Sequence, residues 1–146
     1  MKKLLLVLSL LSVAWVYEDG GGMATVPLGQ VTVTSYQAVE SQTDGNPFIA
    51  ADGTDLRETN EQVCAVSQDF LWFMGGVIRW RDMLVLYIPG YPGGPVVQCV
   101  VRDTMAATIF RSGEEVPLIR HVDLLDGVYG KWTGRALLMG GERCAF

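Results

Sequence analysis

The chain has 146 residues, of which 49% are hydrophobic and only 18% charged, and its formal net charge is −5. This length allows one domain, or one domain with an appendage, and an acidic chain without a block of Lys and Arg is a poor candidate for binding nucleic acid. The usual zinc spacings are absent, because His121 is the one histidine and the nearest two cysteines lie 35 positions apart. The class of catalytic chemistry that remains is one performed by carboxylates.

The first segment has the pattern of a targeting signal. Lys2 and Lys3 precede an apolar run at residues 4–13, and Ser12-Val13-Ala14 offers small residues for a signal peptidase. The apolar run is shorter than the roughly 20 residues that span a membrane. We therefore expect residues 1–22 to be a signal peptide, cleaved after Ala14, with a Gly-rich linker, and the product to be secreted, periplasmic or in the cell envelope. An uncleaved anchor and a buried N-terminal helix are the alternatives.

The remaining chain, residues 23–146, predicts one all-β domain. Short apolar or alternating runs rich in β-branched residues indicate strands at 31–36, 63–67, 83–88, 96–102, 116–125 and 132–139. Turn residues separate these runs, and only residues 69–73 and 104–110 could form short helices. This spacing favours a small closed barrel or a sandwich.

Three cysteines, Cys64, Cys99 and Cys144, leave their chemistry open. In an exported protein, one interpretation is a single disulfide with one free thiol, and the sequence does not choose among the three pairings. The equal alternative is that these residues are buried small hydrophobes. A catalytic thiol is not expected, because Cys64 and Cys99 lie within apolar strand-like runs.

Aspartates mark the ends of several predicted strands. Asp69 and Asp103 each follow an apolar strand, Asp44 lies in a polar loop, and Asp123 interrupts an apolar run. Each one by itself fits a turn or a solvated surface. If two converge in one cleft, burial and mutual repulsion raise one pKa and leave an acid beside a carboxylate, the pair that glycosidic cleavage requires.

The order of five motifs carries a family resemblance. They are Thr-Val-Thr-Ser-Tyr at 32–36, Gln-Thr-Asp at 42–44 before Asn46-Pro47, Ala-Val-Ser-Gln-Asp at 65–69, Val-Arg-Asp-Thr-Met at 101–105 and Val-Asp-Leu at 122–124. From about Gln30 to Leu125 the chain resembles the three-aspartate domain of bacterial and phage cell-wall proteins. It is similar to the catalytic barrel of membrane-bound lytic transglycosylase A. The resemblance implies a six-stranded double-psi β-barrel.

The resemblance also implies the site. Asp123 is expected to act first as general acid and then as general base, with Asp103 raising its pKa, and Asp44 is the third family aspartate. The expected substrate-binding residues are Tyr36, Thr43, Asp69, Arg102 and Thr104. Arg102 is either a strand-end surface residue or a contact to the carboxylates of the peptide stem.

Two features depart from the family pattern or stay ambiguous. The 20-residue spacing from Asp103 to Asp123 is longer than usual in the family, and residues 110–118 predict an added hairpin or loop at the edge of the cleft. His121 either approaches the cleft or lies on the strand surface. The tryptophans Trp72, Trp80 and Trp132 are either sugar-stacking platforms or, for Trp72 beside Phe70 and Phe73, part of the core.

The sequence therefore predicts a secreted or phage-encoded peptidoglycan lytic transglycosylase. It would cleave the bond between N-acetylmuramic acid and N-acetylglucosamine and form a 1,6-anhydro ring. Its partner would be peptidoglycan glycan strands, with no cofactor, metal or nucleic acid, and with membrane contact only through an uncleaved leader. The alternatives are an expansin-like, non-catalytic module that binds wall polysaccharide and a phage accessory protein.

Overall fold

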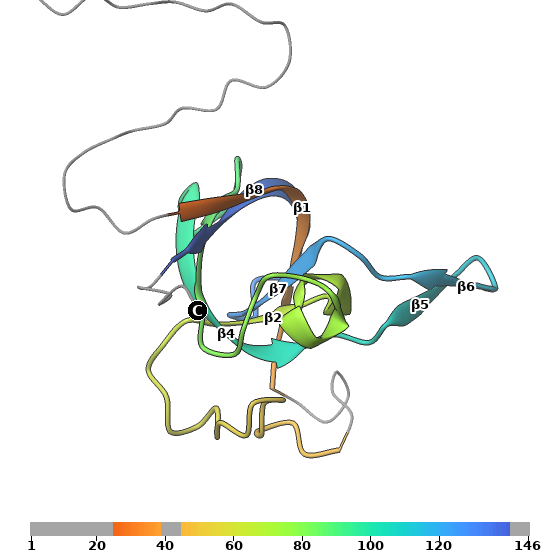
Figure 1. Ribbon diagram of the computed structural model, residues 1–146, viewed down its shortest axis with the longest axis horizontal. Helices are drawn as coiled ribbons and strands as arrows, with labels where there is room; N and C mark the ends of the chain where they lie inside the picture. Colours follow the sequence, from red (N-terminus) through yellow and green to blue (C-terminus); the bar gives the residue numbers. More distant parts are fainter. Residues whose placement is uncertain (1–24, 39–44, 141–146) are drawn as a thin grey trace, which may run out of the picture.

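The computed structural model describes residues 25–38 and 45–140 as strands, two short 3-10 helices and connecting loops (Figure 1). The elements are β1 (Thr25–Tyr36), β2 (Val63–Val66), η1 (Gln68–Phe70), η2 (Trp72–Met74), β3 (Met83–Tyr87), β4 (Val96–Thr104), β5 (Thr108–Arg111), β6 (Glu114–Pro117), β7 (His121–Leu125) and β8 (Lys131–Met139). The predicted leader, Thr43, Asp44 and Cys144 lie outside the described residues. Within the described ranges no helix is long and apolar enough to cross a bilayer.

Six strands form a closed barrel in the order β1-β7-β2-β4-β3-β8. Two neighbouring pairs, β1 with β7 and β2 with β4, are parallel, and the other four pairs are antiparallel. Figure 1 shows the barrel ring, with the connection that carries η1 and η2 lying beside it. The all-β, closed-barrel prediction is confirmed, and closure leaves none of these six apolar strands with an unpaired edge.

The pairing pattern repeats between two halves of the barrel. One half consists of β1, β2 and β3, and the other of β4, β7 and β8. The pairing of β1 with β7 and β8 matches that of β4 with β2 and β3 in strand direction and in register, apart from bulges. The antiparallel pairs β2–β7 and β3–β8 join the halves. This pseudo-twofold interlocking of two parallel pairs is the predicted double-psi arrangement.

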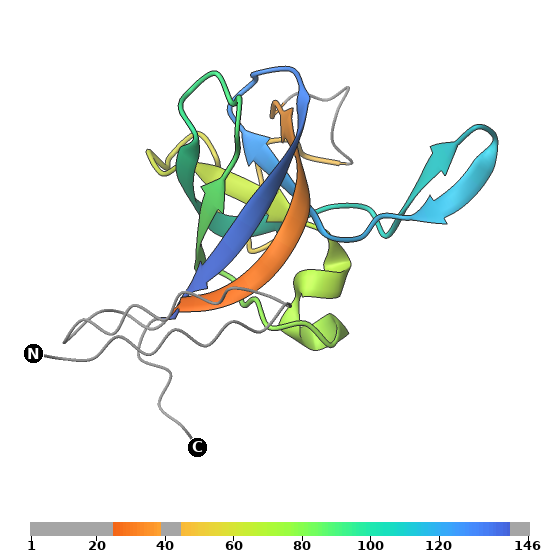
Figure 2. The ribbon, with the colours of Figure 1, turned by 90° about the horizontal axis from the view of Figure 1, so that it is seen from above.

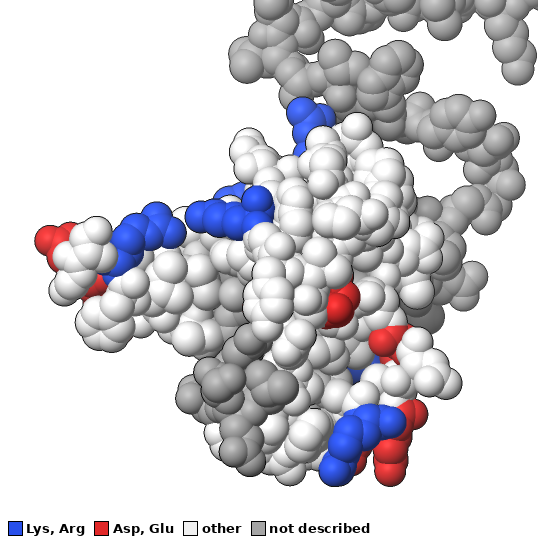
Figure 3. Space-filling model, turned by 180° about the vertical axis from the view of Figure 1, so that it is seen from behind, with Lys and Arg blue, Asp and Glu red and all other residues white. Residues whose placement is uncertain are grey.

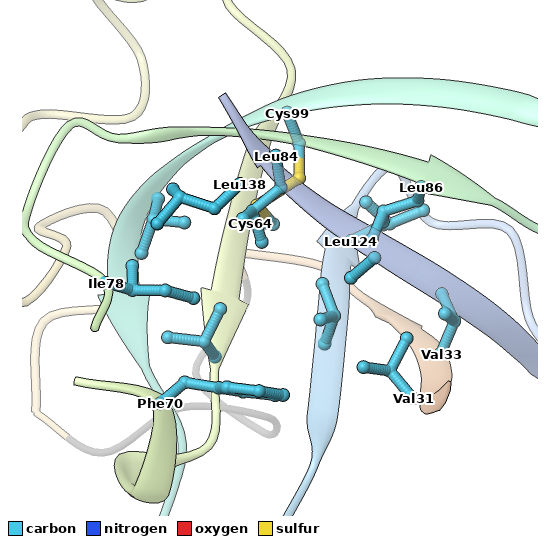
Figure 4. Close-up of a cluster of buried hydrophobic side chains, with 14 of the residues drawn as sticks. Val31, Val33, Cys64, Phe70, Ile78, Leu84, Leu86, Cys99, Leu124 and Leu138 are labelled. Carbon is cyan, nitrogen blue, oxygen red and sulfur yellow. A yellow bond between two sulfur atoms is a disulfide. The ribbon is translucent and has the colours of Figure 1, made fainter. Parts of the chain in front are cut away.

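Inward-facing side chains from all six strands fill the barrel (Figure 4). Val33, Leu84, Leu124 and Leu138 are among the fully buried ones. Each such side chain contributes about 1.5–3 kcal/mol relative to an exposed one, so the core supplies most of the folding free energy. Phe70 of η1 and Ile78 cover the end of this core from outside the barrel strands (Figure 4).

Inside the barrel, Cys64 of β2 and Cys99 of β4 form a disulfide with a Cα–Cα distance of 5.7 Å (Figure 4). The sequence left three pairings and a non-bonded alternative open, and the structure selects this one. The two strands are neighbours, so the bond cross-links a parallel pair whose segments lie 35 residues apart in sequence.

The predicted insertion is a two-stranded hairpin of β5 and β6 that projects from the barrel (Figure 2). Ser112 and Gly113 form its tip with φ values of 53° and 82°, the left-handed pair of a tight hairpin turn. Phe110 is 79% exposed. Seen from behind, the hairpin ends in charged side chains, whereas much of the adjoining barrel surface is uncharged (Figure 3).

Two secondary-structure predictions are wrong. The single strand expected at 116–125 is divided, because β6 ends at Pro117, Arg120 has a φ of 50°, and β7 begins at His121. Residues 104–110 do not form a short helix, because Thr104 ends β4 and Thr108, Ile109 and Phe110 belong to β5. β-Branched and aromatic side chains favour the extended conformation once a partner strand is present, and β6 supplies that partner. The other predicted helical stretch, at 69–73, is found as the single turns η1 and η2.

Candidate active site

Ala65 of β2 brings the two key aspartates together. It pairs with Asp103 of β4 on one side and with Asp123 of β7 on the other. Directly paired residues point to the same face of a sheet, and Ala65 lies outside the core cluster although only 4% of it is exposed. Asp103 and Asp123 therefore flank a small side chain on the outer wall of the barrel. Two strand spacings, about 10 Å, separate their backbones.

Asp123 belongs to a chain of three side chains. The hydroxyl of Thr34 on β1 donates to Asp123 Oδ1 at 2.7 Å, and the same hydroxyl oxygen lies 2.7 Å from His121 Nε2. Because Thr34 pairs with Asp123 across the parallel β1–β7 ladder, the contact follows directly from the register. With Thr34 donating to Asp123, His121 Nε2 is the donor to Thr34. The arrangement fixes one oxygen of Asp123 and leaves the other available.

Asp103 is held differently. Its Oδ1 accepts hydrogen bonds from the backbone N–H groups of Ala51 and Thr104, both at 3.0 Å. The hydroxyl of Tyr36, at the end of β1, donates to Oδ2 at 3.4 Å. Asp103 therefore ties the end of β4 to the 45–62 segment and to β1, while its second oxygen faces Tyr36.

Burial shifts the protonation of this cluster. It raises the pKa of Asp123; the Thr34 hydrogen bond opposes that rise, and the charge of Asp103 adds to it. Burial also raises the pKa of Asp103 against its two backbone hydrogen bonds, and it raises the pKa of Tyr36 together with the charges of Asp103 and Asp123. The pKa of His121 is lowered by burial and then by Lys131. These shifts move both carboxyls toward their protonated forms, and the imidazole and the phenol toward their neutral forms.

Thr34 was not singled out from the sequence, and His121 was left between two alternatives. Both belong to the cluster. The signal for Thr34 was its place on the polar face of an alternating strand, but that pattern does not reveal which strand it faces. Ala65 was also missed, because a small apolar residue in an apolar run carries no chemical signal.

Of the remaining predicted site residues, Thr104 contacts Asp103 through its backbone N–H, Asp69 and Arg102 bond elsewhere, and the others lie outside the described part. Both carboxylate oxygens of Asp69 lie 3.1–3.2 Å from the backbone N–H of Arg120, which fixes the turn before β7. Thr104 donates its hydroxyl to the carbonyl of Val66, across the β2–β4 pair. Asp44 and Thr43 lie outside the described residues.

Arg102 faces the 52–61 segment. Its guanidinium donates to Asp52 at 3.1 Å and to Thr54 at 3.0 Å, and forms an ion pair with Glu61 at 2.7 Å. Beside it lies an open hollow of about 450 Å³. The hollow is lined by Thr54, Asp55, Glu58, Thr59, Asn60, Glu61 and Arg102. It shares no lining residue with the carboxylate pair, so the hollow and the pair are separate features.

The aromatic residues of η2 are not core residues. Trp72 and Phe73 are 56% and 50% exposed. The expectation that Trp72 belongs to the core, beside Phe70 and Phe73, is therefore wrong. Of the aromatic residues at 70–73, only Phe70 is buried. Trp132 is half-buried and packs edge-to-face on Tyr91, with ring centroids 5.0 Å apart, and Trp80 packs against the core. The 3-10 turn rotates Trp72 and Phe73 outward although Phe70 points inward.

Among residues 25–38 and 45–140, no group of three His, Cys, Asp or Glu side chains is placed to hold a metal ion. The two carboxylates and Tyr36 can instead exchange protons and accept hydrogen bonds from hydroxyl groups. Comparison of the chain with protein-family models, with curated proteins and with solved structures gave no match. The family resemblance therefore remains a prediction from the motifs, beside a site built from this chain's own geometry.

Proposed function

We propose that this protein is a peptidoglycan lytic transglycosylase in which Asp123 acts as acid and base. One observation carries the proposal: Asp123 and Asp103 flank Ala65 on the outer wall, both buried enough to raise their pKa values. A carboxyl that stays protonated can donate a proton to a glycosidic oxygen, and a neighbouring carboxylate stabilises positive charge at the anomeric carbon. The choice of peptidoglycan rests on the motif resemblance.

The chemistry needs one proton to move twice. Asp123 gives its proton to the oxygen that leaves with N-acetylglucosamine, as the bond to the anomeric carbon of N-acetylmuramic acid breaks. The resulting carboxylate takes the proton of the muramoyl 6-hydroxyl, whose oxygen then bonds to the anomeric carbon and closes the 1,6-anhydro ring. Water is not consumed, and Asp123 ends protonated.

Thr34 and His121 are positioning residues in this proposal. The Thr34 hydroxyl occupies Asp123 Oδ1, so the proton is carried on Oδ2, which is the oxygen available to substrate. His121 orients that hydroxyl through its Nε2. Tyr36 is only 8% exposed and therefore offers little ring surface to a sugar; its hydrogen bond to Asp103 partly opposes the rise that burial causes in the pKa of that group.

An exported protein is the proposed context. The disulfide between Cys64 and Cys99 supports it, because such bonds persist in oxidising compartments and are rare in the reducing cytosol. The leader pattern at residues 1–14 supports the same context. These two features together support a secreted, periplasmic or envelope location, for a bacterial or a phage-encoded protein.

The second candidate is a non-catalytic module that binds wall polysaccharide. One observation favours it: Asp103 Oδ1 accepts two backbone N–H groups, so this carboxylate has a structural role that does not depend on catalysis. In that case the outer wall around Ala65 would bind glycan without cleaving it. The remaining alternative is a phage accessory protein in which the barrel is only a scaffold.

The test is digestion of purified peptidoglycan by the full chain, with detection of 1,6-anhydromuropeptides by mass spectrometry. We expect the anhydro product from the wild type and its loss in Asp123→Asn. Asp126→Asn is the matched control, because Asp126 is an exposed aspartate in the turn directly after β7 and should leave the product unchanged.

Co-sedimentation with sacculi separates the two candidates. Sedimentation without any anhydro product, in wild type and Asp123→Asn alike, would support the binding module and reject the enzyme. Absence of both product and sedimentation would reject both candidates and leave the scaffold role.

A further inference from the structure

We propose that the aromatic loop, residues 72–77, is a membrane-contact element that places its apolar side chains in the interface of a lipid bilayer. Trp72, Phe73, Met74 and Val77 are 56%, 50%, 55% and 45% exposed, and they follow one another around a single turn. Exposed apolar residues are ordinary when scattered, but a contiguous set of large ones marks an interaction surface. The proposal is independent of glycan cleavage.

The backbone holds this loop in place. Leu71 and Ile78, both fully buried, bridge its two ends, and the N–H of Trp72 donates to the carbonyl of Ile78 at 2.9 Å. The Gly76 N–H closes the turn by donating to Leu71, also at 2.9 Å. A Cβ at Gly76 would lie 2.2 Å from the Phe70 backbone, so the turn requires glycine here. The exposed side chains therefore belong to an ordered turn, anchored in the core at its base.

The loop lies at the barrel end from which the N-terminal segment departs. Thr25, the first residue of β1, pairs with Met139, which pairs with Met83 at the start of β3 directly after this connection. Figure 2 shows η1 and η2 at the same end of the barrel as the start of β1. Twenty-four residues precede β1, and they include the apolar run at 4–16. If the leader is the uncleaved anchor, the alternative to cleavage after Ala14, it would bring this end of the barrel toward the lipid.

Charge next to the loop fits lipid headgroups. Arg79 and Arg81 follow the loop and are exposed, with Arg81 3.9 Å from Asp52 in a loose ion pair. Long basic side chains can bury their stems along apolar surface and reach phosphate groups, while tryptophan prefers the boundary between headgroups and acyl chains. Exposed apolar side chains followed directly by basic residues are typical of an interfacial element.

Ring geometry argues against a sugar as the occupant. The rings of Trp72 and Phe73 meet at 89°, and those of Phe73 and Trp80 at 47°. A sugar chain stacks best on ring faces that lie roughly in one plane, and these rings offer no such strip. Met74 and Val77 add flexible or branched aliphatic surface, which suits acyl chains better than hydroxyl groups.

The test uses the full chain with tryptophan retained only at position 72, by changing Trp15, Trp80 and Trp132 to Phe. Mixed phosphatidylcholine and phosphatidylglycerol vesicles should shift its emission to shorter wavelength, and brominated acyl chains should quench it. The matched protein that retains only Trp132 should show neither effect, because Trp132 packs on Tyr91. A melting curve confirms that each variant is folded.

Two further variants give the test its specificity. Phe73→Ser should reduce the quenching of Trp72, whereas Phe110→Ser, on the more exposed tip region of the hairpin, should not. Absence of quenching at Trp72 would overturn the proposal. Trp72 emission that is already at short wavelength without vesicles would also overturn it, because the loop would then be covered by this chain or by a second copy. An equal loss of Trp72 quenching in Phe73→Ser and Phe110→Ser would overturn it as well.

Discussion

The two halves of the barrel share one pairing scheme but differ in what they place on it. On the inner side the equivalent residues Val33 and Val101 are both fully buried valines. On the outer side β7 carries Asp123 where β2 carries Ala65, and β4 carries Asp103 where β1 carries Thr34. The site thus consists of the outer positions at which the halves differ, while matched inner positions build the fold.

A second difference lies in the core. Cys64 and Cys99 cross-link the parallel pair β2–β4 by a disulfide, and the equivalent inner positions of the other parallel pair, β1–β7, are Val122 and Val31. Equivalent positions of the two parallel pairs are therefore held by a covalent bond in β2–β4 and by packing of aliphatic side chains in β1–β7. The pairing scheme itself requires only that these positions be small and apolar.

The largest effect should come from equalising the outer positions. Asp123→Ala gives β7 the residue that β2 already has, and it removes the proposed acid and base. We expect the rate of anhydro product formation to fall by about 10²–10⁴-fold, as for loss of a general acid–base group. The rate is measured by mass spectrometry, and circular dichroism checks the fold. Asp126→Ala is the control, and a rate for Asp123→Ala within tenfold of wild type would contradict the assignment.

Equalising the core positions should cost stability. Cys64→Val with Cys99→Val gives the β2–β4 pair the valines of the β1–β7 pair, and we expect the free energy of unfolding to fall by about 2–5 kcal/mol. Urea unfolding of the wild type with and without reductant gives the comparison. A double variant as stable as the oxidised wild type would show that aliphatic contacts hold both parallel pairs equally well.

The matched valines should respond alike. Val33→Ala and Val101→Ala each remove a fully buried isopropyl group, and we expect each to lower the free energy of unfolding by about 2 kcal/mol. Val96→Ala, at an exposed position of β4, is the control and should have little effect. Costs for Val33 and Val101 that differ by more than about 1 kcal/mol would show that the halves pack differently inside.

The smallest effect is a pH dependence of stability. Burial raises the pKa of Asp123 above 3.8 in the folded state, so ionisation of this group opposes folding. Wild type gains stability as pH falls through the raised pKa, and the gain is complete below the unfolded value.

Asp123→Asn removes this titration. We expect the variant to melt above wild type at pH 7, with a difference that shrinks as pH falls toward 4. Differential scanning calorimetry across this range measures it, with Asp126→Asn as control. A difference that stays constant with pH would show that Asp123 is not buried as an ionised group.

Much of the fold could be predicted from local patterns, because strand alternation and turn residues act over a few positions. The hairpin around Ser112 and Gly113 is an example, since a tight turn between β-branched runs specifies itself. The first part of β1 was not predicted: its Pro27 and Gly29 are poor strand formers, and a bulge against β8 accommodates them. Trp72 was placed in the core because a single 3-10 turn has no periodicity to show which side it exposes.

The sequence by itself determined the β class, the order of the aspartates and the apolar positions available for a core. Only the tertiary structure decided that Ala65 lies between Asp103 and Asp123, and that Thr34 reaches His121 and Asp123 from 87 and 89 residues away. The physical reason is that a period of two assigns side chains to faces but says nothing about which strands are neighbours. In a barrel built from two interlocked parallel pairs, closure sets those neighbours, and with them the site.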